Sequence, residues 1–295
     1  PGVVPGLALA ILALTEPGDR IVIQPPVYPP FYRVVRENDR VVVENHLRCD
    51  NGRFTMDFED LEEHFRAGAK MMILCSPHNP VGRVWGLEEL QQLEQLTARY
   101  EVTVLSDEIW SDLVFPDYKH RPLASLSPEL ASRTLTFMAP SKTFNLAGFY
   151  LSNVIIPNPE LQQKFCAQVQ RIGLAHLNFF GLVASEAAYR EGGAWLDQLL
   201  DYLQQNVDYA ISELAKITPK IKVIRPEGTF VLWLDCRELG IAPEELNSFF
   251  VNKAGIAFSD GMVFGPSGYG FQRMNIGCPQ AVIAKAMERL AKALA

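Results

Sequence analysis

Three motifs of small and polar residues in this chain each follow a short apolar run. They are Ser76–Gly82, Ser106–Trp110 and Ala139–Gly148. Short apolar runs that alternate with helix-like segments are typical of the buried strands of a parallel sheet. Ligands of such sheets bind at the carboxyl ends of the strands. We therefore expect the three motifs to meet at one functional site.

The first two-thirds of the chain alternates between the two kinds of segment. Helical patterns are expected at 5–14, 30–36, 57–65 and 87–99, and strands at 20–24, 41–44, 70–74, 102–105, 134–138 and 152–156. Alternation of this kind predicts an α/β fold with a mainly parallel sheet.

The pattern changes after a helical stretch at 160–190 and a long helix at 194–216. Strands are expected at 222–224, 230–235 and 272–275, with helices at 243–253 and 280–294. We predict a large domain over residues 1–197 and a smaller α+β domain over residues 198–295, built on the long helix.

The composition excludes several classes of protein. A net charge of −7 disfavours nucleic acid or an anionic membrane as the main partner. No apolar run approaches the roughly 20 residues that cross a bilayer, and residues 7–14 are interpreted as a helix, not a signal peptide. The five cysteines are scattered and include no pair at metal-binding spacing, so we expect reduced, buried thiols, no metal site and a cytoplasmic protein. The chain opens at Pro1 without an initiator Met, which suggests a missing N-terminal segment.

Lys142 lies in the third motif, where its amine is bracketed by small and polar residues. A neutral amine condenses with an aldehyde, and partial burial, which lowers the pKa of a lysine, favours that form. The alternative is an ordinary surface lysine. With Asn79 and Asp107 at two other strand ends, Lys142 would form the protein half of a site for pyridoxal 5′-phosphate (PLP). Such sites use a Schiff-base lysine and an acidic partner for the ring nitrogen.

Each partner residue has a structural alternative. Asp107 follows an apolar run, and a buried carboxylate needs a partner; that partner is the PLP ring nitrogen, a helix end or a structural ion pair. Asn79 either donates to the phenolic oxygen of PLP or serves only as a turn residue before Pro80.

Three further features fit the same site. Tyr28, between stiffening prolines, either stacks on the PLP ring or packs within its loop. The segment Gly2–Val4 precedes a helix, whose first N–H groups could bind phosphate, although many helices begin this way. Arg273 lies within an apolar strand and needs an anion, which is either a substrate carboxylate or a carboxylate of the protein.

Together these residues resemble fold-type I PLP enzymes, the aspartate aminotransferase superfamily, over the whole chain after its usual N-terminal segment. The resemblance implies a three-layer αβα large domain of the PLP-dependent transferase type and a homodimer acting on amino acids. It also assigns roles: Lys142 is the Schiff-base lysine, Asp107 the partner of the ring nitrogen, Asn79 the donor to O3′, Tyr28 the stacking aromatic, Arg273 the anchor of the α-carboxylate, and Val3 and Val4 part of the phosphate-binding turn.

Within the superfamily the chain is most similar to the cystathionine β-lyase, or C–S lyase, branch, whose members cleave a Cβ–S bond. Ala139 and Tyr150 stand where aminotransferases often have a Ser and an Arg on the phosphate, with Ser141 a candidate substitute. Trp110 stands where a Tyr would reach the phenolic oxygen, and an indole offers only an N–H there. Three functions therefore stay open: a β-lyase, an aminotransferase for neutral or aromatic amino acids, and a non-catalytic, truncated relative.

Overall fold

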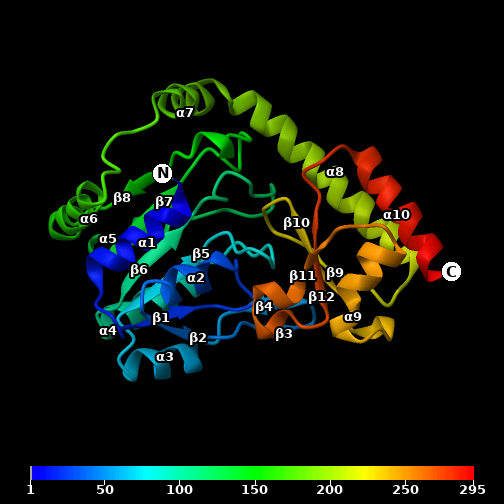
Figure 1. Ribbon diagram of the computed structural model, residues 1–295, viewed down its shortest axis with the longest axis horizontal. Helices are drawn as coiled ribbons and strands as arrows, with labels where there is room; N and C mark the ends of the chain where they lie inside the picture. Colours follow the sequence, from blue (N-terminus) through cyan, green and yellow to red (C-terminus); the bar gives the residue numbers. More distant parts are fainter. Residues whose placement is uncertain (1) are drawn as a thin grey trace.

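The computed structural model describes residues 2–295 and contains a six-stranded sheet at the centre of the large part of the molecule (Figure 1). Its strand order is β2-β1-β5-β6-β7-β8, and neighbouring strands are parallel except for β7 and β8. The strands are β1 (Arg20–Ile23), β2 (Val41–Glu44), β5 (Met71–Cys75), β6 (Thr103–Asp107), β7 (Thr134–Met138) and β8 (Asn153–Ile155). The mainly parallel sheet predicted from the sequence is confirmed.

Helices cover both faces of this sheet. One face packs against α1 (Val3–Leu14), α2 (Pro30–Arg36) and α6 (Pro159–Arg171), and the other against α3 (Phe58–Arg66), α4 (Leu87–Arg99) and α5 (Pro128–Ser132). Successive strand residues point to opposite faces: Ile21 and Ile23 join the cluster around α1, whereas Val22 joins the cluster around α3 and α4. Both faces are buried, which explains the continuous apolar runs in the sequence. The three-layer α/β architecture is thereby confirmed.

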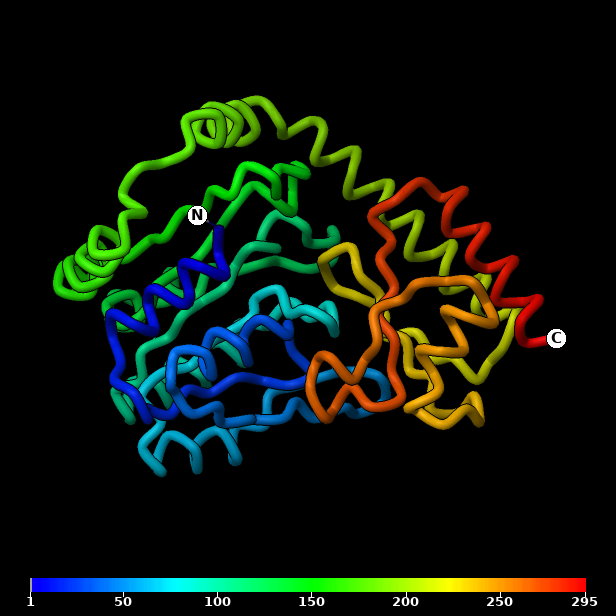
Figure 2. The backbone as a smooth tube through the Cα atoms, in the orientation of Figure 1, coloured from blue at the N-terminus to red at the C-terminus, as the bar shows by residue number. Residues whose placement is uncertain are grey.

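The carboxyl-terminal part contains an antiparallel sheet of order β11-β12-β10-β9. Its strands are β9 (Lys222–Ile224), β10 (Val231–Asp235), β11 (Ser259–Asp260) and β12 (Phe271–Asn275). One face packs on α8 (Gly193–Ile217), α9 (Pro243–Ser248) and α10 (Gln280–Leu294). The opposite face presents Trp233 and Phe271, stacked at 5.1 Å, to the core of the large part. Figure 2 shows α8 running from the large part of the molecule to this carboxyl-terminal part, which we call the small part. The predicted domain boundary at 197/198 falls inside α8, and we propose that the two domains meet there.

Some local structure departs from the sequence prediction. The helical stretch at 160–190 is two helices, α6 and α7 (Phe179–Glu191), separated near Gly173, which has a φ of 74°. The hairpin of β3 (Arg48–Asp50) and β4 (Arg53–Thr55) was not predicted, although its turn residues Asn51 and Gly52 both have positive φ and form a known hairpin signal. Strand β8 is antiparallel to β7, so the sheet is not wholly parallel.

All five cysteines are free, and Cys49 and Cys166 are exposed. The expectation of buried thiols is therefore wrong for these two residues. Across residues 2–295, no helix combines the length and the apolar character that a bilayer crossing requires.

Candidate active site

The sheet brings the three sequence motifs to one edge. Cys75 at the end of β5 lies beside Asp107 at the end of β6 in the parallel register, and Lys142 follows shortly after β7. Helix α1 leads into the amino end of β1, so it runs back along the sheet and its own amino end lies at this same edge. The parallel register therefore gathers chemically active side chains without any need for a long loop.

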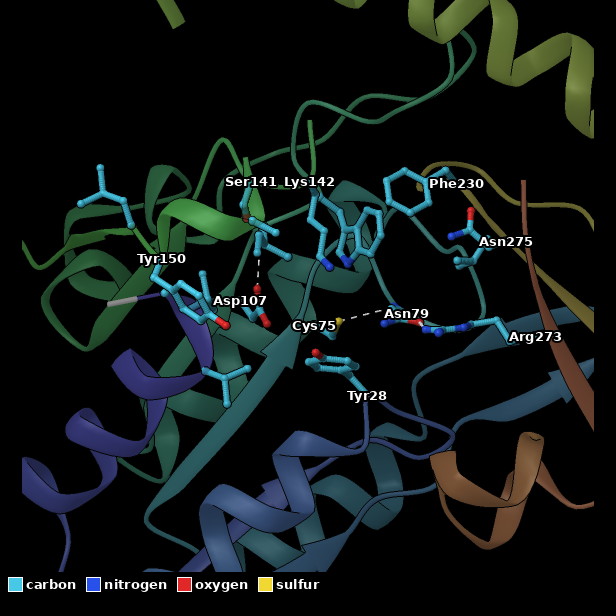
Figure 3. Close-up of a pocket in the computed structure, with 18 residues that line it drawn as sticks. Tyr28, Cys75, Asn79, Asp107, Ser141, Lys142, Tyr150, Phe230, Arg273 and Asn275 are labelled. Atoms are coloured by element: carbon cyan, nitrogen blue, oxygen red, sulfur yellow. Dashed lines mark hydrogen bonds between the residues drawn. The ribbon is translucent and has the colours of Figure 1, made fainter. Parts of the chain in front are cut away.

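A cavity of about 300 Å³ occupies this edge, and we name it the central cavity. All of the site residues predicted from the sequence contribute to its wall: Val3, Val4, Tyr28, Asn79, Asp107, Trp110, Ser141, Lys142 and Arg273. Figure 3 shows Asp107, Lys142, Asn79 and Tyr28 arranged around it, with Arg273 reaching in from β12. Its volume is at the lower end of the range of small-molecule sites.

Asp107 is a buried carboxylate with little to balance its charge. It is 3% exposed and accepts a hydrogen bond from the backbone N–H of Ile109 at 3.2 Å. Burial raises its pKa from 3.8 to about 7, although the Ile109 bond and Lys142 both act to lower it. Among residues 2–295 it forms no ion pair, so the structural ion pair considered from the sequence is absent. A cationic N–H donor in the cavity would supply the missing partner.

Lys142 extends into the cavity, with Nζ 5.4 Å from the ring centroid of the buried Trp110. Burial lowers the pKa of Lys142, and the nearby positive charge of Arg273 lowers it further, while Asp107 acts in the opposite direction. The alternative of an ordinary surface lysine is therefore wrong. A partly buried amine with a lowered pKa is suited to nucleophilic attack and to proton transfer.

Arg273 and Asn79 form a paired arrangement across the two parts of the molecule. Nη1 of Arg273 donates to Oδ1 of Asn79 at 3.0 Å, and Nη2 donates to Oγ of Ser259 at 3.1 Å. Both partners are neutral, and Arg273 makes no ion pair with any carboxylate in the described chain. The charge of Arg273 is therefore uncompensated, and Nδ2 of Asn79 stays available as a donor. Asn79 also lies in a tight turn, closed by the Gly82 N–H to His78 carbonyl bond of 2.7 Å, so its turn role and its cavity position coexist.

The remaining predicted residues complete two sides of the cavity. Tyr28 packs edge-on against Phe31 with ring centroids 6.0 Å apart, and its phenol contributes to the wall. The amino end of α1 presents the N–H groups of Gly2, Val3 and Val4, because Pro5 has none and Gly6 already donates to Gly2. Such a helix end, together with the hydroxyl of Ser141, favours an anionic group.

Sequence reasoning missed several wall residues. Cys75 and Asn275 end strands β5 and β12, and Phe230 lies directly before β10. The strand-end rule applied to every strand would have found the first two. Tyr150, noted in the sequence only as a departure from a pattern, also lines the cavity and adopts a left-handed φ of 49°, a strained conformation that often occurs at functional sites.

The residues present fit PLP. The buried carboxylate of Asp107 requires a cationic donor, which a protonated pyridine ring supplies, and the free amide donor of Asn79 suits a phenolic oxygen. The amine of Lys142 suits the aldehyde, and the amino end of α1 suits the phosphate. Four complementary groups around one cavity agree with the cofactor expected from the sequence.

The pKa of Asp107 generates a stability prediction for the protein without added PLP. Between pH 3.8 and about 7 the folded state holds a proton that the unfolded state has lost, so stability falls as the pH rises through this range. The variant Asp107→Asn has no carboxyl group to ionise at this buried position. At pH 8 its free energy of unfolding should therefore be about 2–4 kcal/mol higher than that of the parent protein, and near pH 4 the two proteins should be equally stable. Urea titrations at several pH values provide the measurement.

The matched control is Asp50→Asn, on the exposed β3–β4 hairpin, which should not raise the free energy of unfolding at pH 8. An Asp107→Asn protein that is less stable than the parent at pH 8 would show that the carboxylate has a stabilising partner.

Comparison with known proteins places this site in a family. The sequence pattern of "Aminotransferase class I and II" matches residues 1–290. Cystathionine beta-lyase PatB of Bacillus subtilis is 44% identical over 295 residues, covering 100% of this chain and 76% of that protein. Cystalysin from Treponema denticola, whose structure contains PLP, superposes with a TM-score of 0.97 at 38% identity, covering 99% of this chain and 75% of that one. A PLP-bound protein from Clostridium difficile that carries an aminotransferase name gives a TM-score of 0.98 at 42% identity over 100% of this chain and 76% of its own. The chain belongs to the class I and II aminotransferase family.

Proposed function

We propose that the protein is a PLP-dependent carbon–sulfur β-lyase. It would act on cystathionine or a related sulfur amino acid and release a thiol, pyruvate and ammonia. The observation that carries this proposal is that Lys142, Asp107, Asn79 and Arg273 surround one cavity and that each lacks the partner that PLP or an amino acid would provide.

Bound PLP supplies an aldehyde that captures an amino-acid amine and a ring that withdraws electrons from the substrate Cα. Asp107 would hold the proton on the ring nitrogen, and Asn79 would donate to the phenolic oxygen. Tyr28 and Trp110 would pack beside the ring, while Val3, Val4 and Ser141 would bind the phosphate.

Arg273 would grip the substrate α-carboxylate, because its charge is not neutralised by the protein. That grip fixes the orientation of the Cα–H bond. Lys142 Nζ, which lies in the wall of the same cavity, would remove the Cα proton, a role that its lowered pKa favours. The Cβ–S bond then breaks with its electron pair leaving on sulfur, which takes up a proton to become the thiol. Water converts the remaining fragment to pyruvate and ammonia.

The choice of a lyase over an aminotransferase is supported by the 44% identity with cystathionine beta-lyase PatB over the whole chain. Trp110 and Ala139, which depart from the usual aminotransferase pattern, favour the same choice. Both reactions use the same residues, and several similar structures, the one from Clostridium difficile among them, carry an aminotransferase name. An assay must therefore separate the two.

We also propose a homodimer in the cytoplasm. A cluster of apolar side chains, Leu177, Phe179 and Phe180, is largely exposed at the start of α7, and Leu177 and Tyr150 line one small depression beside the central cavity. Exposed apolar clusters mark interaction surfaces, and a second copy placed here would cover the open side of the site.

In the first test of function, the protein is mixed with PLP and cystathionine, and the formation of thiol and pyruvate is measured. The proposal expects both products without any added keto acid. Lys142→Ala should abolish both products and the visible absorbance band of lysine-bound PLP. Lys164→Ala, the same substitution at an exposed lysine of α6, is the control and should retain both. Product formation only with a keto-acid acceptor would identify an aminotransferase, and no band with excess PLP would favour a non-catalytic protein.

Substitution of Arg273 should reduce the use of substrate far more than it weakens the binding of PLP. Because Arg273→Met removes the carboxylate anchor, kcat/KM should fall by about 100-fold, equivalent to about 3 kcal/mol, with less than a threefold change in PLP affinity. The kcat/KM of Arg273→Lys should lie between that of the parent protein and that of Arg273→Met, because lysine keeps the positive charge but cannot bind the carboxylate through two parallel hydrogen bonds. The exposed Arg225→Lys is the control. An equal loss of PLP affinity would assign Arg273 to the cofactor instead.

The dimer is tested by light scattering after size-exclusion chromatography, where the expected mass is about twice 33.0 kDa. Phe180→Glu should shift the protein to monomers, because it puts a charge into the apolar cluster, whereas Val251→Glu, also exposed but in the small part, should not. A monomeric parent protein at micromolar concentration would contradict the proposal.

A further inference from the structure

A second cavity, of about 520 Å³, adjoins the central cavity beyond Lys142, and we name it the side cavity. The two cavities share five wall residues: Ser141, Lys142, Ala147, Phe230 and Asn275. Figure 3 shows Phe230 and Asn275 on the side of Lys142 that faces away from Asp107. The side cavity is therefore an extension of the candidate active site and not a separate hollow.

The position of the side cavity relative to Arg273 indicates what it receives. Arg273 and Asn275 are two residues apart on β12, so their side chains point to the same face, about 7 Å apart along the strand. Asn275 in turn pairs with Val231, next to Phe230. A substrate whose carboxylate is held by Arg273 and whose Cα lies at Lys142 thus has the mouth of the side cavity beside its side chain.

The wall of the side cavity is uncharged beyond Lys142. Helix α8 contributes Trp195, Leu199 and Leu203, and Pro279 and Cys278 add further apolar surface. The polar members of the wall are neutral hydroxyl and amide groups, and the hydroxyl of Tyr202 already accepts a hydrogen bond from the backbone N–H of Gln280. Among its wall residues, all of which the structure describes, Lys142 is the one with a charged side chain.

We propose, on the basis of the function proposed above, that the side cavity binds the substituent on the substrate sulfur and selects uncharged, apolar substituents. The preferred substrates are then S-alkyl and S-aryl cysteines. Cystathionine and cystine carry an ammonium and a carboxylate at their far end, for which the wall offers no charged partner, and partial burial of unpaired charges is unfavourable.

The expected selectivity is moderate. Trp195 is 48% exposed and Tyr202 is 41% exposed, so the outer end of the side cavity is open to solvent. The charged end of cystathionine would stay partly hydrated there. We therefore expect a preference of about tenfold for an apolar substituent, the scale associated with small differences in buried apolar surface.

A binding experiment tests this preference without turnover. The probes are 3-(benzylthio)propanoate and 3-(methylthio)propanoate, which keep the carboxylate and the thioether but lack the amine needed for reaction. Calorimetric titration of the PLP-loaded protein should give a Kd about tenfold lower for the benzyl compound. Equal affinities would overturn the proposal, because the apolar wall would then contribute nothing.

Two variants separate charge from shape. Trp195→Arg places a cation in the wall and should reduce the preference for the benzyl probe to less than threefold. Trp195→Leu keeps the wall apolar and should retain most of the preference. Gln198→Arg adds the same charge to α8 outside the wall and is the control for a general effect of charge. Loss of the preference in Gln198→Arg as well would contradict a local role of the side cavity.

A turnover comparison completes the test. The ratio of kcat/KM for S-benzylcysteine to that for cystathionine should be about ten in the parent protein and should fall at least threefold in Trp195→Arg. Comparing one ratio between variants cancels the intrinsic reactivity of each leaving thiolate. Cystathionine preferred by the parent protein would overturn the inference while leaving the lyase intact. If the probes bind with the expected preference but no substrate yields a thiol, the proposed lyase activity is wrong and the proposed role of the side cavity still holds.

Discussion

A carboxylate buried at the end of a parallel strand is the constraint on which the site depends. Asp107 is held at the carboxyl end of β6, between β5 and β7, where the sheet allows it almost no contact with water. One backbone N–H is too little to balance a full negative charge, and burial accordingly raises its pKa to about 7. A ligand that brings a positive N–H to this position relieves an unfavourable charge already present in the fold. The protein without its cofactor is therefore less stable than its packing would allow.

The two parts of the molecule are joined where the site needs them. Arg83 is buried and forms ion pairs with Glu89 at 2.8 Å and with Glu227 at 2.9 Å. These contacts fix the turn that carries Asn79 against the segment that leads into Phe230 and β10. The hydrogen bond from Arg273 to Asn79 crosses the same junction. Removing one partner of a buried ion pair strongly destabilises a protein. The ion pairs of Arg83, which lie outside the cavity, therefore help to fix the distance between its cofactor side and its substrate side.

Much of this arrangement follows from the sequence because its signals are local. Residues 87–99, 134–138 and 280–294 match a helix, a strand and a helix of the structure, since their apolar periodicity and flanking residues act over a few positions. Lys142, Asp107 and Asn79 could be placed together because parallel strands end at a common edge. Whether Arg273 pairs with a carboxylate of the protein could be decided only from the structure, because no local sequence pattern shows which side chains reach it. The side cavity was equally hidden, since α8 and the end of β12 meet only through tertiary packing.

The most direct test of the account is the protonation state of the cofactor ring nitrogen, read from the ¹⁵N chemical shift of labelled PLP bound to the protein. The account predicts the shift of a protonated ring nitrogen in the parent protein and that of a neutral ring nitrogen in Asp107→Asn. A neutral ring nitrogen in the parent protein, or a shift that the substitution leaves unchanged, would contradict the claim that Asp107 faces the ring.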